Sequence, residues 1–269
     1  MNQETTTMTT NTPNSLSASI ELNDHAVALF QNGHYQRALL GFKHAMSVSK
    51  QALEDPNNRR SVVVVERPGK PLDDAQASPS MDQFMMVSSS SSTSCEQQQQ
   101  QNNDEEERIY RRPIRFMTSS PATPVPTPIL VSSGIIFNLA LTMHIMAISN
   151  NGSRHGKGGD EQQVDLSKPY HLYELSYQCL QTYGENGELL NQSPLFFLAV
   201  MNNMGMIHQQ LQEVEHAQVM FEKMIQLIMY YIDCGCYQTL LGGENEASTK
   251  CFFNNIKSFI TSIKTAPAA

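Results

Sequence analysis

Near the start of the chain, a glycine separates two stretches that have the periodicity of a helix. Apolar residues recur three and four positions apart on both sides of Gly33, namely Ala26, Leu29 and Phe30 before it and Ala38, Leu39, Phe42, Ala45 and Met46 after it. This spacing places the apolar side chains on one helix face, and glycine often ends a helix because it adopts the left-handed conformation without strain. Residues 20–54 are therefore predicted to form a helix, a tight turn and a second helix.

The residues after this pair have a different composition. Residues 55–128 are rich in serine, glutamine, proline and acidic residues, as in "SSSSSTSCEQQQQQNNDEEE", and such sequence buries too little apolar surface to fold. Two islands, "SVVVVE" at 61–66 and "RIYRRPIRFM" at 108–117, could pair as short strands, although Pro113 interrupts the second. We predict a long disordered insert that holds at most a short β-pairing, and a disordered polar tail at 1–19.

Helical periodicity returns over residues 129–265. It covers 129–148 and starts again near Asp165 or Ser167, either of which is a good residue to cap a helix. A further helix is expected from Pro194, because proline fits the first turn of a helix. A short turn and another helix follow it, and a last helix comes after a Gly-Gly break. The second half is thus predicted to be helical throughout.

The first helix pair resembles a tetratricopeptide repeat. The residues that carry the resemblance are those of the turn and the second helix, namely Gly33, Tyr35, Ala38, Phe42 and Ala45. Two weaker copies follow, with Ala140, Tyr173 and Ser176 in the middle copy and Gly205, Ala217 and Phe221 in the last. "FNLAL", "NNMG" and "CFFNN" are also similar to a little-characterised group of repeat proteins from diatoms, a similarity that implies no function.

This resemblance implies an all-α fold of stacked antiparallel helix pairs. One pair cannot bury its apolar face alone, so about three pairs and a capping helix are expected to form a right-handed solenoid. The expected interior consists of Phe30, Phe42, Phe137, Leu139, Phe221, Met224 and Ile225. The expected contacts of the capping helix are Phe252, Phe253, Ile256, Phe259 and Ile260.

The resemblance further implies a concave groove lined by the first helix of each pair. The positions that fall there are Asn23, Val27, Phe30, Phe137, Leu141, His144, Asn202, Met206 and Gln209. None is lysine or arginine, which family members use to clamp the acidic tails of chaperones, so binding of such tails is not expected. An apolar groove with amides suits an extended or helical peptide. The expected function is a non-catalytic scaffold or adaptor that binds a protein or peptide.

The composition of the chain indicates in which cellular compartment the protein is expected and which classes of ligand it is not expected to bind. The formal net charge of -8 argues against binding to nucleic acid or to an anionic membrane surface. The N-terminal residues lack the basic and apolar regions of a secretion signal. Five cysteines, an odd number without regular spacing, do not indicate a disulfide framework. An intracellular location, cytoplasmic or nuclear, is expected.

One stretch leaves an alternative open. Residues 129–148 carry no formal charge and are long enough to cross a bilayer. They include Ser132, Asn138 and His144, which are costly in lipid without partners, so a buried helix is the favoured interpretation. The alternative functions are a membrane-associated subunit with a span at 129–148, or an accessory subunit of an enzyme complex.

No pattern of catalytic, cofactor-binding or metal-binding residues stands out. The sequence contains no G-x-S-x-G, phosphate-binding loop or dinucleotide fingerprint. The best metal candidates are Cys234 and Cys236, with Cys251, His208 and His216 as further ligands, but structural zinc sites normally show two closely spaced ligand pairs. We therefore expect no enzyme activity, no cofactor and no metal.

The insert offers a possible means of regulation. Ser/Thr-Pro pairs, which proline-directed kinases recognise, begin at Ser78, Ser120, Thr123 and Thr127. A phosphate adds negative charge and three acceptor oxygens to a segment. These residues are candidate phosphorylation sites.

Overall fold

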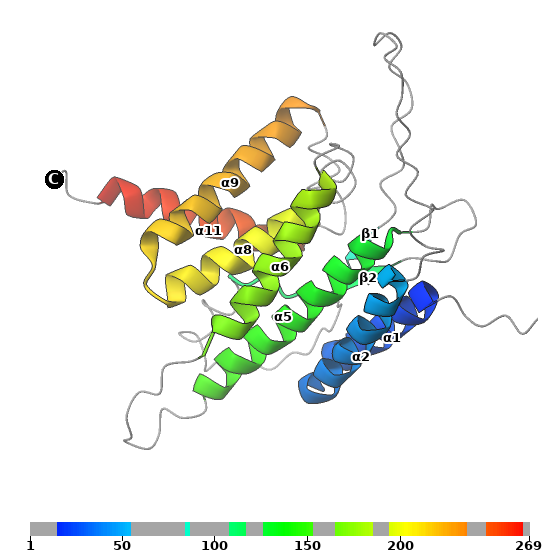
Figure 1. Cartoon of the computed structure of the whole chain (residues 1–269). Helices are drawn as coiled ribbons and strands as arrows, with labels where there is room; N and C mark the ends of the chain where they lie inside the picture. The colour runs from blue at the N-terminus through cyan, green and yellow to red at the C-terminus, as the bar shows by residue number, and fades with distance from the viewer. Residues whose placement is uncertain are drawn as a thin grey trace, which may run out of the picture.

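The computed structural model describes residues 15–54, 84–86, 108–116, 126–152, 165–184, 194–235 and 246–265. Seven helices lie within these ranges, together with one pair of short strands. The predicted all-α class is confirmed (Figure 1). The helices are α1 (Ser15–Gln31), α2 (Tyr35–Glu54), α5 (Pro128–Gly152), α6 (Ser167–Gly184), α8 (Pro194–Gln210), α9 (Val214–Asp233) and α11 (Glu246–Thr265).

The helices stack as pairs in the order of the chain. Helix α1 packs on α2, α5 on α6 and α8 on α9, while α2 contacts α5 and α6 contacts α8. Helix α11 lies against α8 and α9 and closes the stack (Figure 1). Each element therefore contacts mainly its neighbours in sequence, as in a solenoid, and the expected arrangement of three pairs and a terminal helix is confirmed.

The first and last pairs are closed by the same kind of turn. In each turn one residue has a left-handed backbone, Gly33 with φ 75° and Gln212 with φ 61°. The Gly33 N–H donates to the Phe30 carbonyl (3.0 Å) and the His34 N–H to the Leu29 carbonyl (2.9 Å), the two bonds of a Schellman motif. The equivalent bonds of the second turn run from Gln212 to Gln209 (3.1 Å) and from Glu213 to His208 (2.8 Å).

Small residues allow the paired helices to approach closely. A Cβ atom added at Gly41 of α2 would lie 2.8 Å from Cβ of Ala26 on α1. A Cβ atom added at Gly205 of α8 would lie 2.9 Å from Cζ of Phe221 on α9. Both distances are shorter than a carbon–carbon contact, so these two pairs require glycine at these positions.

Most of the expected core residues are buried. Phe42, Phe137 and Phe221 are completely enclosed, whereas Ile225 is only half-buried. On α11 the expectation is partly wrong, because Phe253 and Ile260 are about 40% exposed while Phe252 and Phe259 are buried (39%, 41%, 1% and 8%). A single helix at the end of the stack buries only the face that contacts α8 and α9.

Helix α5 is the central helix of the stack. Pro128–Ser149 is long and apolar enough to span a membrane by length and composition, and 83% of its most apolar window is buried in the fold. Its polar side chains have partners on neighbouring helices: the Ser132 hydroxyl lies 2.6 Å from that of Ser49 on α2, and Ser133 donates to the Ser176 carbonyl of α6 (3.0 Å). The favoured interpretation of 129–148 as a buried helix agrees with these contacts.

One of two helix boundaries differs from the expected one. Helix α1 begins at Ser15, so the predicted tail at 1–19 extends too far; Ser15 to Ser19 continue the helix because Leu16 and Ser19 are buried. Helix α6 begins at Ser167, within the predicted start near Asp165 or Ser167, and the Asp165 carboxylate accepts a bond from the Ser167 N–H (3.2 Å).

The larger correction concerns the insert. The β-pairing joins β1 (Phe84–Met86) to β2 (Ile114–Phe116) in antiparallel register, with Phe84 opposite Phe116. The expected partner at 61–66 lies outside the described residues. The expectation that residues 55–128 cannot pack is wrong for 108–116, where the buried side chains are those of Ile109, Tyr110, Pro113, Ile114 and Phe116.

Candidate peptide-binding groove

One face of the helix stack, formed by α1, α5, α8 and α11, packs against a segment of the same chain that ends in strand β2. We call residues 108–116 the internal segment. Its first residues contact α8 and α11, and its last residues contact α1 and α5. From Arg108 to Phe116 the internal segment therefore passes α8 first and then α5 and α1, the reverse of the order of these helices in the sequence.

Two asparagines bind the main chain of the internal segment in the same way. Oδ1 of Asn138 accepts the Ile114 N–H (2.7 Å), and Nδ2 of Asn138 donates to the Ile114 carbonyl (2.8 Å). Asn203 makes the same two bonds with Tyr110 (2.9 and 3.1 Å). An asparagine amide thus pairs with both main-chain groups of one residue, as a neighbouring β-strand does.

Three further asparagines donate to carbonyls of the internal segment. Nδ2 of Asn23 donates to Ile114 (3.0 Å). Nδ2 of Asn202 and Nδ2 of Asn255 both donate to Arg108 (3.0 and 2.8 Å). All of these asparagines are at most 1% exposed, and a buried amide must find partners to offset its desolvation. The amides therefore hold the backbone of the internal segment at both ends.

The asparagines also bind one another. Nδ2 of Asn138 donates to Oδ1 of Asn23 (2.9 Å), which links α5 to α1. Nδ2 of Asn255 donates to Oδ1 of Asn202 (2.8 Å), which links α11 to α8. The asparagines form two groups that connect the helices as well as the internal segment, so loss of one amide affects its neighbours.

Aromatic rings anchor the side chains of the internal segment. The Tyr110 ring stacks on Phe252 of α11 (centroids 5.2 Å apart, 17° between planes) and lies 6.5 Å from the Phe137 ring of α5. The Phe116 ring rests on Gly134, where an added Cβ atom would lie 2.5 Å from its Cζ. Aromatic residues at both ends thus fix the position of the segment along the groove.

The internal segment is basic, and one of its arginines interacts with polar side chains of α1. Its arginines are Arg108, Arg111, Arg112 and Arg115. The Arg115 guanidinium donates to Oε1 of Gln31 (3.0 Å) and lies near Asp24. Asp24 also accepts a bond from the Phe116 main chain, and its partial burial raises the pKa of its carboxyl group. This end of the groove therefore suits a basic segment.

His144 lies completely buried on α5. Burial lowers the pKa of its imidazole to about 4, and the Arg111 charge acts in the same direction, while the bond of Nε2 to Oε1 of Gln210 (3.4 Å) opposes both. Its ring packs edge-on against Tyr173, at a centroid distance of 5.9 Å. His144 is therefore a neutral core residue at pH 7.

The residues predicted to line the groove are not open to solvent. Eight are buried and Gln209 is half-buried. Asn23 and Asn202 bind the internal segment through hydrogen bonds, and the Phe137 ring lies beside Tyr110. The buried remainder consists of Val27, Phe30, Leu141, His144 and Met206.

The sequence analysis missed Asn138, Asn203 and Asn255. The signal was present in "FNLAL", "NNMG" and "CFFNN", each of which contains one of them. Asn138 and Asn203 each follow a predicted groove residue directly, at Phe137 and Asn202. Asparagine thus recurs at the same position in the first helices of two successive pairs, which indicates a shared role, and in the structure both asparagines bind the main chain of the internal segment.

The remaining candidates are the phosphorylation sites and the cysteines. Thr127 is exposed and directly precedes α5; Ser78, Ser120 and Thr123 lie outside the described residues, as does Cys236. Cys234 is exposed and Cys251 is buried. Burial raises the pKa of the Cys251 thiol to about 12, so it stays protonated at neutral pH.

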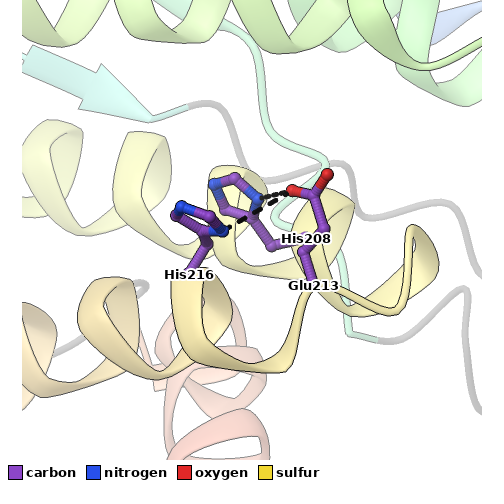
Figure 2. A group of neighbouring side chains, drawn as sticks. All are labelled: His208, Glu213 and His216. Carbon is purple, nitrogen blue, oxygen red and sulfur yellow. Dashed lines mark hydrogen bonds and ion pairs between the residues drawn. The ribbon is translucent and has the colours of Figure 1, made fainter.

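A cluster of two histidines and a glutamate occupies the turn between α8 and α9 (Figure 2). Nδ1 of His208 lies 2.7 Å from Oε2 of Glu213, and Nδ1 of His216 lies 3.9 Å from the same oxygen. One ligand atom from each residue falls within 4.8 Å of the others. Among the described residues, this is the one group of three histidine, cysteine or carboxylate side chains that lie close enough together to hold a metal ion. The sequence analysis considered both histidines but not Glu213.

Comparison with known protein families, with curated proteins and with solved structures finds no match to this chain.

Proposed function

We propose that this protein is a non-catalytic interaction scaffold whose asparagine-lined groove binds an extended peptide segment. The observation that carries the proposal is the pairing of Asn138 and Asn203 with both main-chain groups of one residue each. Main-chain recognition supplies affinity to any extended chain, and side-chain pockets supply the choice of sequence. The internal segment would then occupy the groove that a partner enters.

The contacts of the internal segment define the chemistry of the expected partner. An aromatic ring is needed at the position of Tyr110, which stacks on Phe252. An aliphatic residue follows at the position of Ile114, and a second aromatic residue lies against Gly134. Asp24 near Arg115 favours a basic residue between these two. The partner is therefore a basic extended segment with aromatic residues at both ends, the opposite of an acidic tail.

The experiment measures binding of a fluorescent peptide with the sequence RIYRRPIRF to the full chain. A tethered segment competes at an effective concentration on the order of millimolar, so the unchanged protein should bind the peptide weakly. Tyr110→Ala weakens the internal segment and should increase the affinity for the peptide at least tenfold. The matched control is a peptide with alanine at the tyrosine, which should bind neither protein.

A second measurement does not depend on that variant. If the internal segment exchanges, the amide hydrogens of Tyr110 and Ile114 should exchange with solvent faster than those in the middle of α5. Equal exchange rates, together with a folded Tyr110→Ala protein that does not bind the peptide, would show that the internal segment is a permanent part of the fold. The groove would then be excluded as a partner site.

A further inference from the structure

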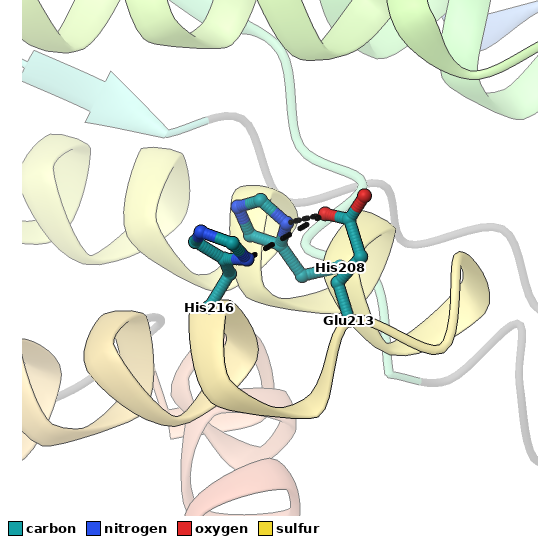
Figure 3. A network of polar contacts seen from close by, with 3 residues as sticks. All are labelled: His208, Glu213 and His216. Atoms are coloured by element: carbon teal, nitrogen blue, oxygen red, sulfur yellow. Dashed lines mark hydrogen bonds and ion pairs between the residues drawn. The ribbon is translucent and has the colours of Figure 1, made fainter.

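The cluster at the α8–α9 turn has the composition of a transition-metal site. It offers two imidazole nitrogens and a carboxylate oxygen, from His208, His216 and Glu213 (Figure 3). Imidazole ligands suit zinc and its neighbours in the first transition row, whereas magnesium and calcium prefer oxygen alone. Three protein ligands leave the fourth position of a tetrahedral site to water.

The backbone of the turn fixes where two of the ligands lie. The Glu213 N–H donates to the His208 carbonyl (2.8 Å), and the left-handed Gln212 between them closes the turn. His208 is buried, and its ring packs edge-on against Tyr170 of α6 at 4.8 Å between centroids. The His208 ring is thus held in place by packing, as a metal ligand requires.

The side chains of the other two ligands, Glu213 and His216, are exposed enough to rotate and complete the site. Glu213 stands at the N-cap of α9 but makes no capping bond with its side chain, and its carboxylate points to the histidines instead. The side chains of Glu213 and His216 are 46% and 71% exposed. Ligands of tetrahedral zinc lie about 3.3 Å apart, so small rotations of these two side chains suffice to reach that geometry from the present 2.7 and 3.9 Å.

The cluster is not a general consequence of the helix-pair architecture. The first pair has the same turn, with Gly33 in place of Gln212. Counting from these two residues, the positions of His208, Glu213 and His216 correspond to Leu29, His34 and Arg37. Leucine and arginine are not metal ligands, so of these two described turns the α8–α9 turn alone has three donors.

We propose that the α8–α9 turn binds one divalent transition-metal ion of the zinc class through His208, Glu213 and His216. The ion would join the last turn of α8 to the first turn of α9. An ion that binds the folded chain and not the unfolded chain would stabilise the fold, by an amount that grows with the logarithm of the metal concentration above the dissociation constant.

The experiment titrates the full chain with Zn²⁺ by calorimetry and with Co²⁺ by visible absorption. Wild-type protein should bind one ion, with the d–d bands of a site that has nitrogen and oxygen ligands and without a thiolate charge-transfer band. Zn²⁺ should also raise the melting temperature by several degrees. His216→Ala and Glu213→Gln, both at exposed positions, should each weaken binding at least tenfold.

The matched control is His171→Ala. His171 and Glu174 form an exposed histidine–carboxylate pair on α6, with 3.6 Å between their ligand atoms, and this pair is outside the cluster. His171→Ala should bind Zn²⁺ as the wild type does. The proposal would be overturned if the wild type did not bind Zn²⁺, or if His216→Ala bound it as tightly as the wild type. It would also be overturned if His171→Ala lost as much affinity as His216→Ala, or if a thiolate band appeared that Cys234→Ser removed.

Discussion

Removal of the Asn138 amide tests whether the asparagines hold the internal segment. In Asn138→Ala the buried Ile114 N–H loses its acceptor, while the Ile114 carbonyl keeps the bond from Asn23. The Oδ1 atom of Asn23 loses a donor as well. The substitution therefore leaves one donor without its acceptor, and two acceptors, the Ile114 carbonyl and Oδ1 of Asn23, with one donor fewer each, all at buried positions.

The expected cost follows from these losses. A buried donor without a partner costs about 1–3 kcal/mol, and each further lost bond costs about 1 kcal/mol. We expect Asn138→Ala to lower the free energy of unfolding by about 3 kcal/mol, a large fraction of the roughly 5–15 kcal/mol that stabilises a typical domain. The matched control is Asn32→Ala, because the Asn32 side chain is exposed and donates only to the Ala28 carbonyl of α1, the helix that ends just before it (2.9 Å).

Two assays separate loss of the internal segment from general damage. Urea unfolding followed by far-UV circular dichroism measures the total effect. Trypsin cleavage after Arg108 and Arg111 under native conditions measures opening of the internal segment, and about 3 kcal/mol corresponds to roughly a hundredfold faster cleavage when opening is rapid and reversible. The reasoning is refuted if Asn138→Ala changes neither quantity by more than Asn32→Ala does.

Four further substitutions test the packing, the turns and the buried imidazole. Ala38→Leu adds bulk at a completely buried position of α2 and should cost about 1–3 kcal/mol by overpacking; an unchanged melting temperature would count against close packing of the first pair. Gln212→Gly should stabilise the protein by about 0.5–1 kcal/mol and Gly33→Ala should destabilise it by a similar amount, because both positions have positive φ; opposite signs in urea unfolding confirm this. Burial holds the pKa of His144 at about 4, below its ordinary 6.5, so the unfolded chain binds a proton that the folded chain does not as pH falls between these values. The wild type should therefore lose about 3 kcal/mol over this range, and His144→Gln should lose much less; parallel pH profiles of the two proteins would exclude this role.

The sequence was sufficient to predict the helices and the turns between paired helices. Helical spacing and the turn glycine at Gly33 predict the first pair, and the closely packed Gly41 and Gly205 agree with a stack that depends on small residues. These predictions succeed because they depend on local conformation and on which face of a helix is apolar, and both are visible within a few residues.

The internal segment was not predictable in the same way. Residues 108–116 are flanked by low-complexity sequence, and the segment itself is rich in arginine. The groove was expected to be open, although the chain itself contains a segment that fits it. The hydrogen bond from Asn23 to Ile114, 91 positions apart, connects parts of the chain that no local pattern relates.

The sequence by itself determined the class of the fold, the helix pairs and the amide character of the groove. Tertiary structure alone decided what fills the groove and which carboxylate lies between His208 and His216. The physical reason is that helix formation and amphipathicity follow from neighbouring residues. The pairing of an asparagine with a distant main chain, or of ligands across a turn, depends on where the packed helices place each side chain.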